Sequence, residues 1–254
     1  MAITIKSERE IELMAEAGKI LERVHNELEK ALRPGMSTKD VDTLGEEIIR
    51  SYGCIPSFLN YNGYPASICV SVNQEVVHGI PDKHRIIQEG DIVSLDAGVI
   101  YKGYHSDAAR THAVGEVSEE AKKLIQVTKE CFFEGIKYAK AGNHLFDISG
   151  AIGRYAEERG YGVVRDLCGH GIGTALHEAP EIPNYEVGRK GVRLRPGMTL
   201  AIEPMINIGT YEVDWLDDDW TVVTRDGSLS AHYENTILIT EGEPRILSLT
   251  CDNE

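Results

Sequence analysis

The sequence lacks the features that mark exported or membrane-spanning proteins. Its first residues, MAITIKSEREIELM, contain no apolar run of signal-peptide length. A membrane-spanning helix needs roughly eighteen or more consecutive apolar residues, and the chain contains no such run. We therefore expect a cytoplasmic protein that neither crosses a membrane nor is secreted.

Paired cysteines and an excess of positive charge are also missing. The five cysteines are odd in number and include no Cys-x-x-Cys pair, so neither a disulfide framework nor a zinc ribbon is indicated. A formal net charge of −15 disfavours general binding of nucleic acid, which needs Lys and Arg gathered on one face. We expect reduced thiols at Cys54, Cys69, Cys131, Cys168 and Cys251.

The residues that are present predict a globular α/β (α+β) protein with a sizeable core, because 42% are hydrophobic and 26% are charged. Apolar side chains recur at helical spacing from Ser7 to Leu32, where Arg33-Pro34-Gly35 ends the pattern. Ser37 is a suitable N-cap for a second helix that ends at Gly53. The runs SICVSV and DIVSLDAGVI then predict strands.

Landmarks of this first part return later in the chain at one constant offset of 107 positions. A chance match among common glycines is the alternative to a true internal repeat. A true repeat predicts two similar halves, about 1–110 and 111–254, within a single catalytic domain over 1–254. A helix at about 118–140 would join the halves, and one site would form where they face each other. The matched pairs are Gly35 and Gly142, Gly53 and Gly160, Gly90 and Gly197, and Asp96 and Glu203.

The segment DIVSLDAGVIYKGYHSDAART predicts a hairpin with Lys102-Gly103 in its turn. A centre between Tyr101 and Lys102 would place Asp96 directly opposite Asp107. Directly opposed like charges destabilise a strand pair unless a cation lies between them. The hairpin therefore allows a bound cation, while the alternative is that one aspartate caps a turn.

Three further polar positions have two interpretations each. His170, in DLCGHGIGTALHEAP, could bind a metal or be a structural histidine, because His177 follows at a spacing unlike that of the HExxH zinc motif. Glu203 in MTLAIEPMI and Glu234 in SAHYENTILIT have apolar neighbours on both sides. They could be buried acids, which need partners, or exposed acids on edge strands.

Several segments together resemble consecutive blocks of the type I, bacterial-form methionine aminopeptidases, over nearly the whole chain. This resemblance implies the pita-bread fold, with internally duplicated α/β halves, antiparallel sheet and helices on the outer face. It also implies a metalloaminopeptidase that removes the initiator methionine from nascent proteins and peptides when the second residue is small. The segments are NGYPASICVSVNQEVVHGIP, GDIVSLDAG, GYHSDAART, CGHGIGTALHEAP, PGMTLAIEPM and HYENTILIT.

By the same resemblance, two divalent metal ions bind at the carboxylates and His170, with Asp107 and Glu234 bridging them. Such a ligand set suits cobalt, manganese, iron, zinc or nickel. Bound metal lowers the pKa of a water molecule so that it can attack the scissile carbonyl. Glu203 would also shuttle the proton, and His78 and His177 would contact the scissile peptide. The implied ligands are Asp96, Asp107, His170, Glu203 and Glu234.

The resemblance also implies an apolar pocket for the methionine side chain. This sequence departs from frequent family residues at Leu176, Asn62 and Asn235, where Phe, His and His are common. A monovalent-cation site is implied at Asn73 and Ser230. The implied pocket residues are Phe58, Tyr61, Tyr64, Cys69, Leu176 and Trp220.

Relatives with other activities are the alternatives. A proline-directed aminopeptidase or dipeptidase of this fold usually carries an additional N-terminal domain, and a non-catalytic binding relative usually loses metal ligands. Only 25 residues separate His177 from Glu203, where type II enzymes have a helical insertion. We expect a monomer that acts on N-terminal segments of nascent chains and contacts the ribosome transiently.

Overall fold

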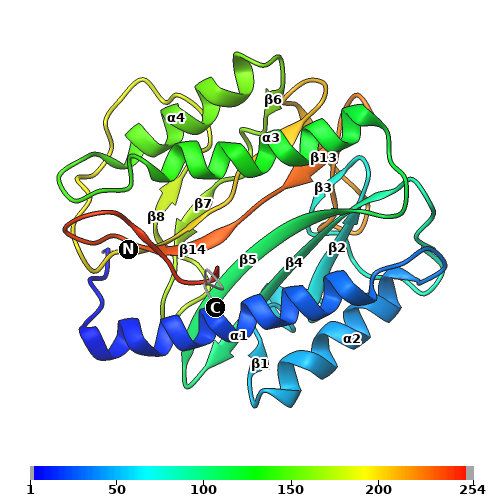
Figure 1. Ribbon diagram of the computed structural model, residues 1–254, viewed down its shortest axis with the longest axis horizontal. Coiled ribbons are helices and arrows are strands. Elements are labelled where there is room, and N and C mark those ends of the chain that lie inside the picture. The colour runs from blue at the N-terminus through cyan, green and yellow to red at the C-terminus, as the bar shows by residue number, and fades with distance from the viewer. Residues whose placement is uncertain (1–2, 250–254) are drawn as a thin grey trace.

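A computed structural model describes residues 3–249 and places the strands between two pairs of helices (Figure 1). Helices α1 (Glu8–Ala31) and α2 (Thr38–Ser51) lie on one side, and α3 (Glu119–Ile136) and α4 (Leu145–Glu157) on the other. None of the helices in the described range has the length and apolar character needed to span a membrane. Cys251 lies outside this range, and the other four cysteines are free thiols.

The first two helices begin where the sequence predicts, because serine caps both of them. Ser37 accepts a hydrogen bond from the Asp40 amide, and the Asp40 carboxylate accepts one from the Ser37 amide. The apolar stripe of α1 packs against β4 (Ile92–Tyr101) and β5 (Tyr104–Ala113). These helices and strands enclose one apolar core, and a second core lies beneath α3 and α4.

All strand pairs are antiparallel and fall into four sheets. In the first sheet β4 pairs with β1 (Ile55–Pro56), β2 (Ile68–Val72) and β5. The five-stranded sheet has the order β15 (Arg245–Ile246), β14 (Asn235–Leu238), β9 (Thr199–Ile202), β7 (Gly169–Gly171), β8 (Glu178–Ile182). Two smaller sheets have the orders β13 (Ser230–His232), β10 (Met205–Asn207), β6 (Gly162–Val163) and β11 (Val213–Trp215), β12 (Val222–Thr224), β3 (Glu75–Val77).

The predicted register of the β4–β5 hairpin is wrong by two residues, because Asp96 lies opposite Ala109 and not Asp107. Lys102 and Gly103 form a two-residue turn, and both have positive φ, 49° and 87°. The hairpin is therefore centred between these two residues. Asp96 pairs with Ala109, so Asp96 and Asp107 are diagonal neighbours on one face of the sheet.

The residues that the constant offset matches also have similar backbone conformations. The three matched glycine pairs all have positive φ, at 90° and 92°, 71° and 82°, and 93° and 86°. Ser37 and His144, separated by the same offset, each precede a helix with a capping box. Each also forms an isolated bridge, to Ile86 and Arg193 respectively. The chain therefore forms the same sequence of turns twice.

Strands from the two parts of the chain meet between β5 and β14, which lie side by side in Figure 1. The amide of Glu234 donates to the carbonyl of Ala109 at 3.0 Å. The hydroxyl of Thr236 accepts from the Asp107 amide and donates to the Asp107 carbonyl, both at 2.9 Å. This contact brings Asp107 and Glu234 together although they are distant in sequence.

Candidate metal centre and substrate pocket

A cavity of about 750 Å³ is lined by residues from early and late parts of the chain, from Phe58 to Glu234. It is lined by every residue that the sequence predicts as a metal ligand, a catalytic group or a pocket residue. Asn73 and Ser230 do not line it; they contact each other elsewhere, with the Ser230 amide donating to the Asn73 carbonyl at 2.9 Å. The predicted ligands come from β4 (Asp96), β5 (Asp107), β7 (His170), the residue after β9 (Glu203) and the residue before β14 (Glu234).

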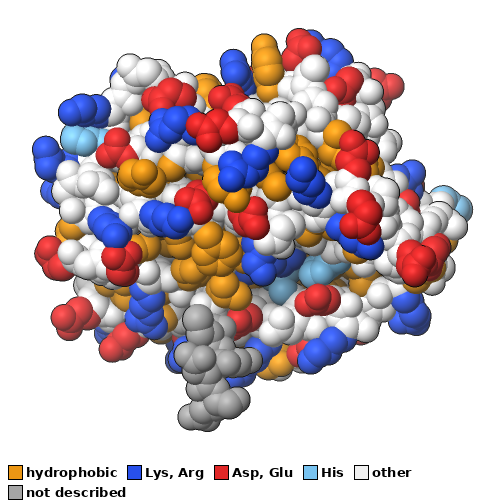
Figure 2. All heavy atoms as spheres, turned by 45° about the horizontal axis from the view of Figure 1, so that its top comes forward, with side chains coloured by type: hydrophobic (Ala, Val, Ile, Leu, Met, Phe, Trp, Pro, Cys, Tyr) orange, Lys and Arg blue, Asp and Glu red, His pale blue; other side chains and the backbone are white. Residues whose placement is uncertain are grey.

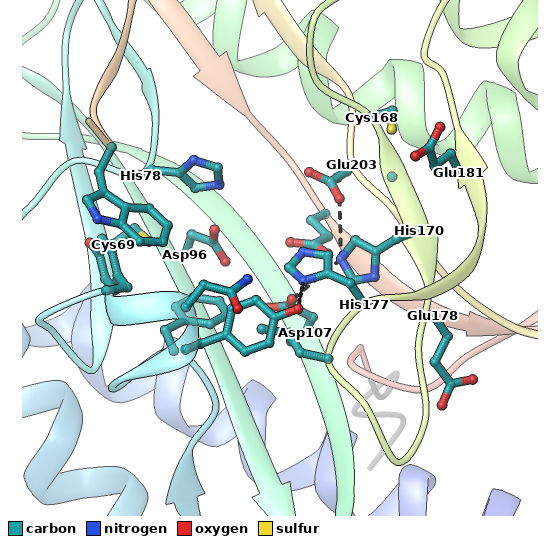
Figure 3. A pocket seen from close by; sticks show the side chains of 18 of the residues that line it. Cys69, His78, Asp96, Asp107, Cys168, His170, His177, Glu178, Glu181 and Glu203 are labelled. Atoms are coloured by element: carbon teal, nitrogen blue, oxygen red, sulfur yellow. Dashed lines mark hydrogen bonds and ion pairs between the residues drawn. The ribbon is translucent and has the colours of Figure 1, made fainter. Parts of the chain in front are cut away.

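Asp107, His170 and Glu234 form a group in the cavity that could hold a metal ion. One ligand atom of each lies within 4.8 Å of the others, and residues 3–249 contain no other such group of three. The Nε2 atom of His170 is 3.6 Å from Oε1 of Glu203 and 3.9 Å from Oδ2 of Asp107 (Figure 3). Its Nδ1 atom lies 2.8 Å from the carbonyl oxygen of Gly171, to which it donates. The lone pair of Nε2 therefore faces the acids.

Burial and mutual repulsion disfavour charge on these acids. Burial raises the pKa of Asp96 to about 7. Burial, followed by the negative charge of Asp96, also raises the pKa of Asp107 and of Glu203. Burial and then the charge of Asp107 raise the pKa of Glu234. Without a compensating charge the acids thus resist simultaneous ionisation.

His170 cannot supply that compensating charge. Burial, and then the neighbouring His177, lower its pKa to about 3, so the short distances to Asp107 and Glu203 are not ion pairs near neutral pH. Buried oxygens of three acids also have no hydrogen-bond partner among the described residues. They are Oδ1 of Asp96, Oδ1 of Asp107 and Oε1 of Glu234. Clustered carboxylates with free oxygens and one neutral imidazole fit divalent cations.

The two other histidines that the sequence predicts for the site, His78 and His177, also line the cavity. The Nδ1 atom of His177 is 2.7 Å from the Tyr61 hydroxyl, and its ring centroid is 4.1 Å from that of His170. His78 has a positive φ of 58°, which is uncommon for a residue with a side chain. Burial and then His177 lower the pKa of His78 to about 4, and burial lowers that of His177. Both rings therefore face the cavity as neutral groups near neutral pH.

One end of the cavity is aromatic and apolar. The Tyr64 ring meets Trp220 edge to face at 5.1 Å, and its hydroxyl donates to the Gly79 carbonyl at 2.9 Å. Burial raises the pKa of the Cys69 thiol well above its usual value, so the sulfur remains protonated. Leu176 is only 2% exposed and belongs to the same apolar cluster. This end has the chemistry that a thioether side chain requires.

Asn62 and Asn235 are two of the three positions where this sequence departs from frequent family residues, and their surroundings differ from each other. Asn62 lines the cavity. Asn235 does not; its Oδ1 accepts a hydrogen bond at 2.6 Å from Arg110, which also donates to the Glu234 carbonyl. Asn235 therefore supports the backbone next to Glu234.

Sequence reasoning did not identify several residues near the acids. Cys168, Glu178 and Glu181 line the cavity, and Nε2 of the buried His232 is 3.7 Å from Oε2 of Glu203. The alternation of SAHYENT, which places His232 two positions before Glu234, was a usable signal for that histidine.

Comparison with known proteins shows the family to which this chain belongs. Residues 12–241 match the metallopeptidase family M24. The methionine aminopeptidase of Clostridium acetobutylicum is 58% identical to this chain, over 97% of the chain and 99% of the relative. This chain belongs to the methionine aminopeptidases of family M24. A crystal structure of methionine aminopeptidase from Thermotoga maritima matches with a TM-score of 0.96 and 48% identity, covering 98% of this chain and 100% of that one.

Membership of this family confirms the predicted pita-bread fold and the predicted activity. The chain is a metallopeptidase that removes the N-terminal methionine of peptide substrates, and its family implies divalent metal ions. The Xaa-Pro dipeptidase of Bacillus anthracis is less similar, at 28% identity and a TM-score of 0.78. This chain covers 62% of that structure, so the proline-directed alternative is disfavoured.

Proposed function

We propose that this methionine aminopeptidase cleaves substrates whose second residue is small, with five side chains holding two divalent cations. The observation that carries the proposal is the convergence of three buried acids, the partly buried Glu203 and one neutral imidazole in a single cavity. Asp107 and Glu234 would bridge the cations, which agrees with the backbone hydrogen bond that holds Glu234 against β5 at Ala109. The complete set is Asp96, Asp107, His170, Glu203 and Glu234.

The bound cations would supply a water molecule acidic enough to act as a nucleophile and a positive charge for the scissile carbonyl oxygen. Glu203 would accept the proton of the attacking water and deliver it to the leaving amine, since its Oε1 lies 3.6 Å from Nε2 of His170 beside the other acids. Its own backbone carbonyl is held by the Asn184 side chain at 3.0 Å.

The histidines orient the peptide and stabilise the charge that develops on it. When the Tyr61 hydroxyl donates to Nδ1 of His177, the ring carries its proton on Nε2 and can donate to the substrate. His78 contacts the scissile peptide from the side near Trp220. The methionine side chain occupies the apolar end, lined by Phe58, Tyr61, Tyr64, Cys69, Leu176 and Trp220.

The cellular setting is also part of the proposal. We infer a cytoplasmic monomer with one catalytic domain of two halves, acting on nascent chains during transient contact with the ribosome. The face drawn in Figure 2 mixes acidic and basic side chains and presents no field of one sign. A monovalent cation would bind near Asn73 and Ser230, where the unpaired, buried Oδ1 of Asn207 lies on the strand neighbouring Ser230.

Peptide cleavage with defined metals tests this function. Chelated protein should be inactive, and one or more of manganese, iron, cobalt, nickel and zinc should restore cleavage of Met-Ala-Ser. Met-Lys-Ser should be cleaved far more slowly, because a long second side chain would crowd the acidic centre. Equal cleavage of the two peptides, or preferential cleavage of Xaa-Pro peptides, would contradict the proposal.

A further inference from the structure

The cavity has a second, acidic end that the proposed function leaves unused. In Figure 3 Cys69 and His78 lie at one end, and Cys168, Glu178 and Glu181 lie on the opposite side of the His170 and Glu203 pair. A peptide whose first side chain occupies the apolar end and whose scissile bond lies at the acids must continue past them. Its next residues then reach the acidic end, since an extended chain advances about 3.3 to 3.6 Å per residue.

Strand pairing directs Glu181 towards the cavity. Glu181 on β8 pairs directly with His170 on β7, and directly paired residues of an antiparallel sheet point to the same face. Cys168, Glu181 and Glu203 all line this part of the cavity. The Glu181 carboxylate is therefore close to the reaction centre, on the side away from the methionine pocket.

The two glutamates at this end differ in charge compensation. Oε2 of Glu178 is 2.6 Å from the Lys6 ammonium, within a pair whose side chains are only 11% and 4% exposed. The Thr4 hydroxyl donates to the same oxygen at 2.5 Å. The exposed Glu181 side chain has no hydrogen bond or ion pair within residues 3–249. Its negative charge is available to a substrate.

We propose that Glu181 is a specificity-determining residue that favours substrates with Lys or Arg at the third position. The inference rests on the proposed function, because the direction of the bound peptide follows from the methionine pocket and the acidic centre. Glu181 is solvent-accessible, so its attraction to a cationic side chain is modest and weakens with salt. We expect kcat/KM to be about threefold higher for Lys than for Gln at this position.

Steady-state cleavage of matched peptides tests the assignment. The peptides are Met-Ala-Lys-Ser, Met-Ala-Gln-Ser and Met-Ala-Glu-Ser, with Met-Ala-Ser-Lys as the positional control. Wild type should prefer Lys over Gln and Gln over Glu at the third position. Glu181→Gln should lose this preference while still cleaving Met-Ala-Gln-Ser, and Glu181→Lys should reverse it.

Glu47→Gln is the matched control, because it makes the same change in net charge at an exposed position on α2 that does not line the cavity. It should retain the wild-type preference. Equal ratios in wild type and Glu181→Gln, an equal loss in both Gln variants, or a preference confined to the fourth position would overturn the inference. Failure to cleave any of these peptides would instead contradict the proposed function.

Discussion

At the residue scale, the acids of the cavity lower the stability of the metal-free protein, but they also supply the atoms that bind metal. Each buried carboxylate that lacks a partner costs folding free energy, because ionised groups lose hydration when they are buried. The same free oxygens are the atoms that a divalent cation needs. We therefore interpret the unpaired oxygens of Asp96, Asp107 and Glu234 as a functional feature that costs the metal-free protein stability.

Asp107→Asn should abolish turnover with little change in fold. A neutral amide cannot bridge two cations as a carboxylate does, and loss of several kcal/mol of charge stabilisation lowers the rate by at least ~100-fold. Cleavage of Met-Ala-Ser would be measured with each metal in turn, and circular dichroism would monitor the fold. Glu47→Gln serves as the active control. Turnover close to wild type after metal is restored would refute the bridging role.

At the element scale, α1 lies so close to the C-terminal segment that one of its residues must be glycine. A Cβ atom added at Gly18 would lie 2.0 Å from the carbonyl oxygen of Leu247, which is backbone and cannot rotate away. A Cβ at Gly45 on α2 would instead meet the end of the Ile68 side chain at 3.0 Å. Side chains can adjust where backbone cannot.

We accordingly expect Gly18→Ala to lower the free energy of unfolding by ~1 to 3 kcal/mol. Gly45→Ala should be close to neutral, because a helical alanine recovers up to ~1 kcal/mol of helix propensity. Urea denaturation of both variants measures the difference. A Gly18→Ala protein as stable as Gly45→Ala would show that α1 can move away from residue 247.

The elements also show what the sequence could and could not predict. Helix starts were predictable because Ser7 and Ser37 satisfy local backbone amides. The centre of the β4–β5 hairpin was not predictable, since nothing in the composition of the hairpin shows that Lys102 adopts a positive φ. Glu181 was missed because its pairing with His170 joins two separate strands beside a register shift, which no local periodicity predicts.

The ligand set was predictable from resemblance to a family, and not from local pattern. Asp107 and Glu234 meet through the contact between β5 and β14, which no short-range periodicity describes. The repeated glycines gave the only physical indication that two distant acids, Asp96 and Glu203, belong to one site.

At the scale of the whole molecule, metal removal should change both the stability and its dependence on pH. A carboxylate whose pKa is raised by folding destabilises the native state at every pH above its unfolded pKa of about 4. The metal-free protein should therefore become more stable as the pH falls from about 7, the pKa of Asp96, towards about 5. Metal-loaded protein should melt at a higher temperature at neutral pH and lose stability on acidification, because protons displace the metal.

Melting curves of chelated and metal-loaded protein across this pH range make the comparison. Asp96→Asn is the control, because its metal-free form should gain less stability on acidification than metal-free wild type. Superimposable curves for chelated and loaded protein at every pH would mean that the acids do not form one metal site.

The contact between β5 and β14 also governs when activity can arise during synthesis of the chain. Asp96 and Asp107 leave the ribosome long before Glu234 and Thr236, which complete their surroundings. Until the later strands emerge, the two aspartates stay hydrated, and no metal-binding centre forms in the first part of the chain. A chain terminated before β14 should therefore have no residual peptidase activity, however well its first two helices fold.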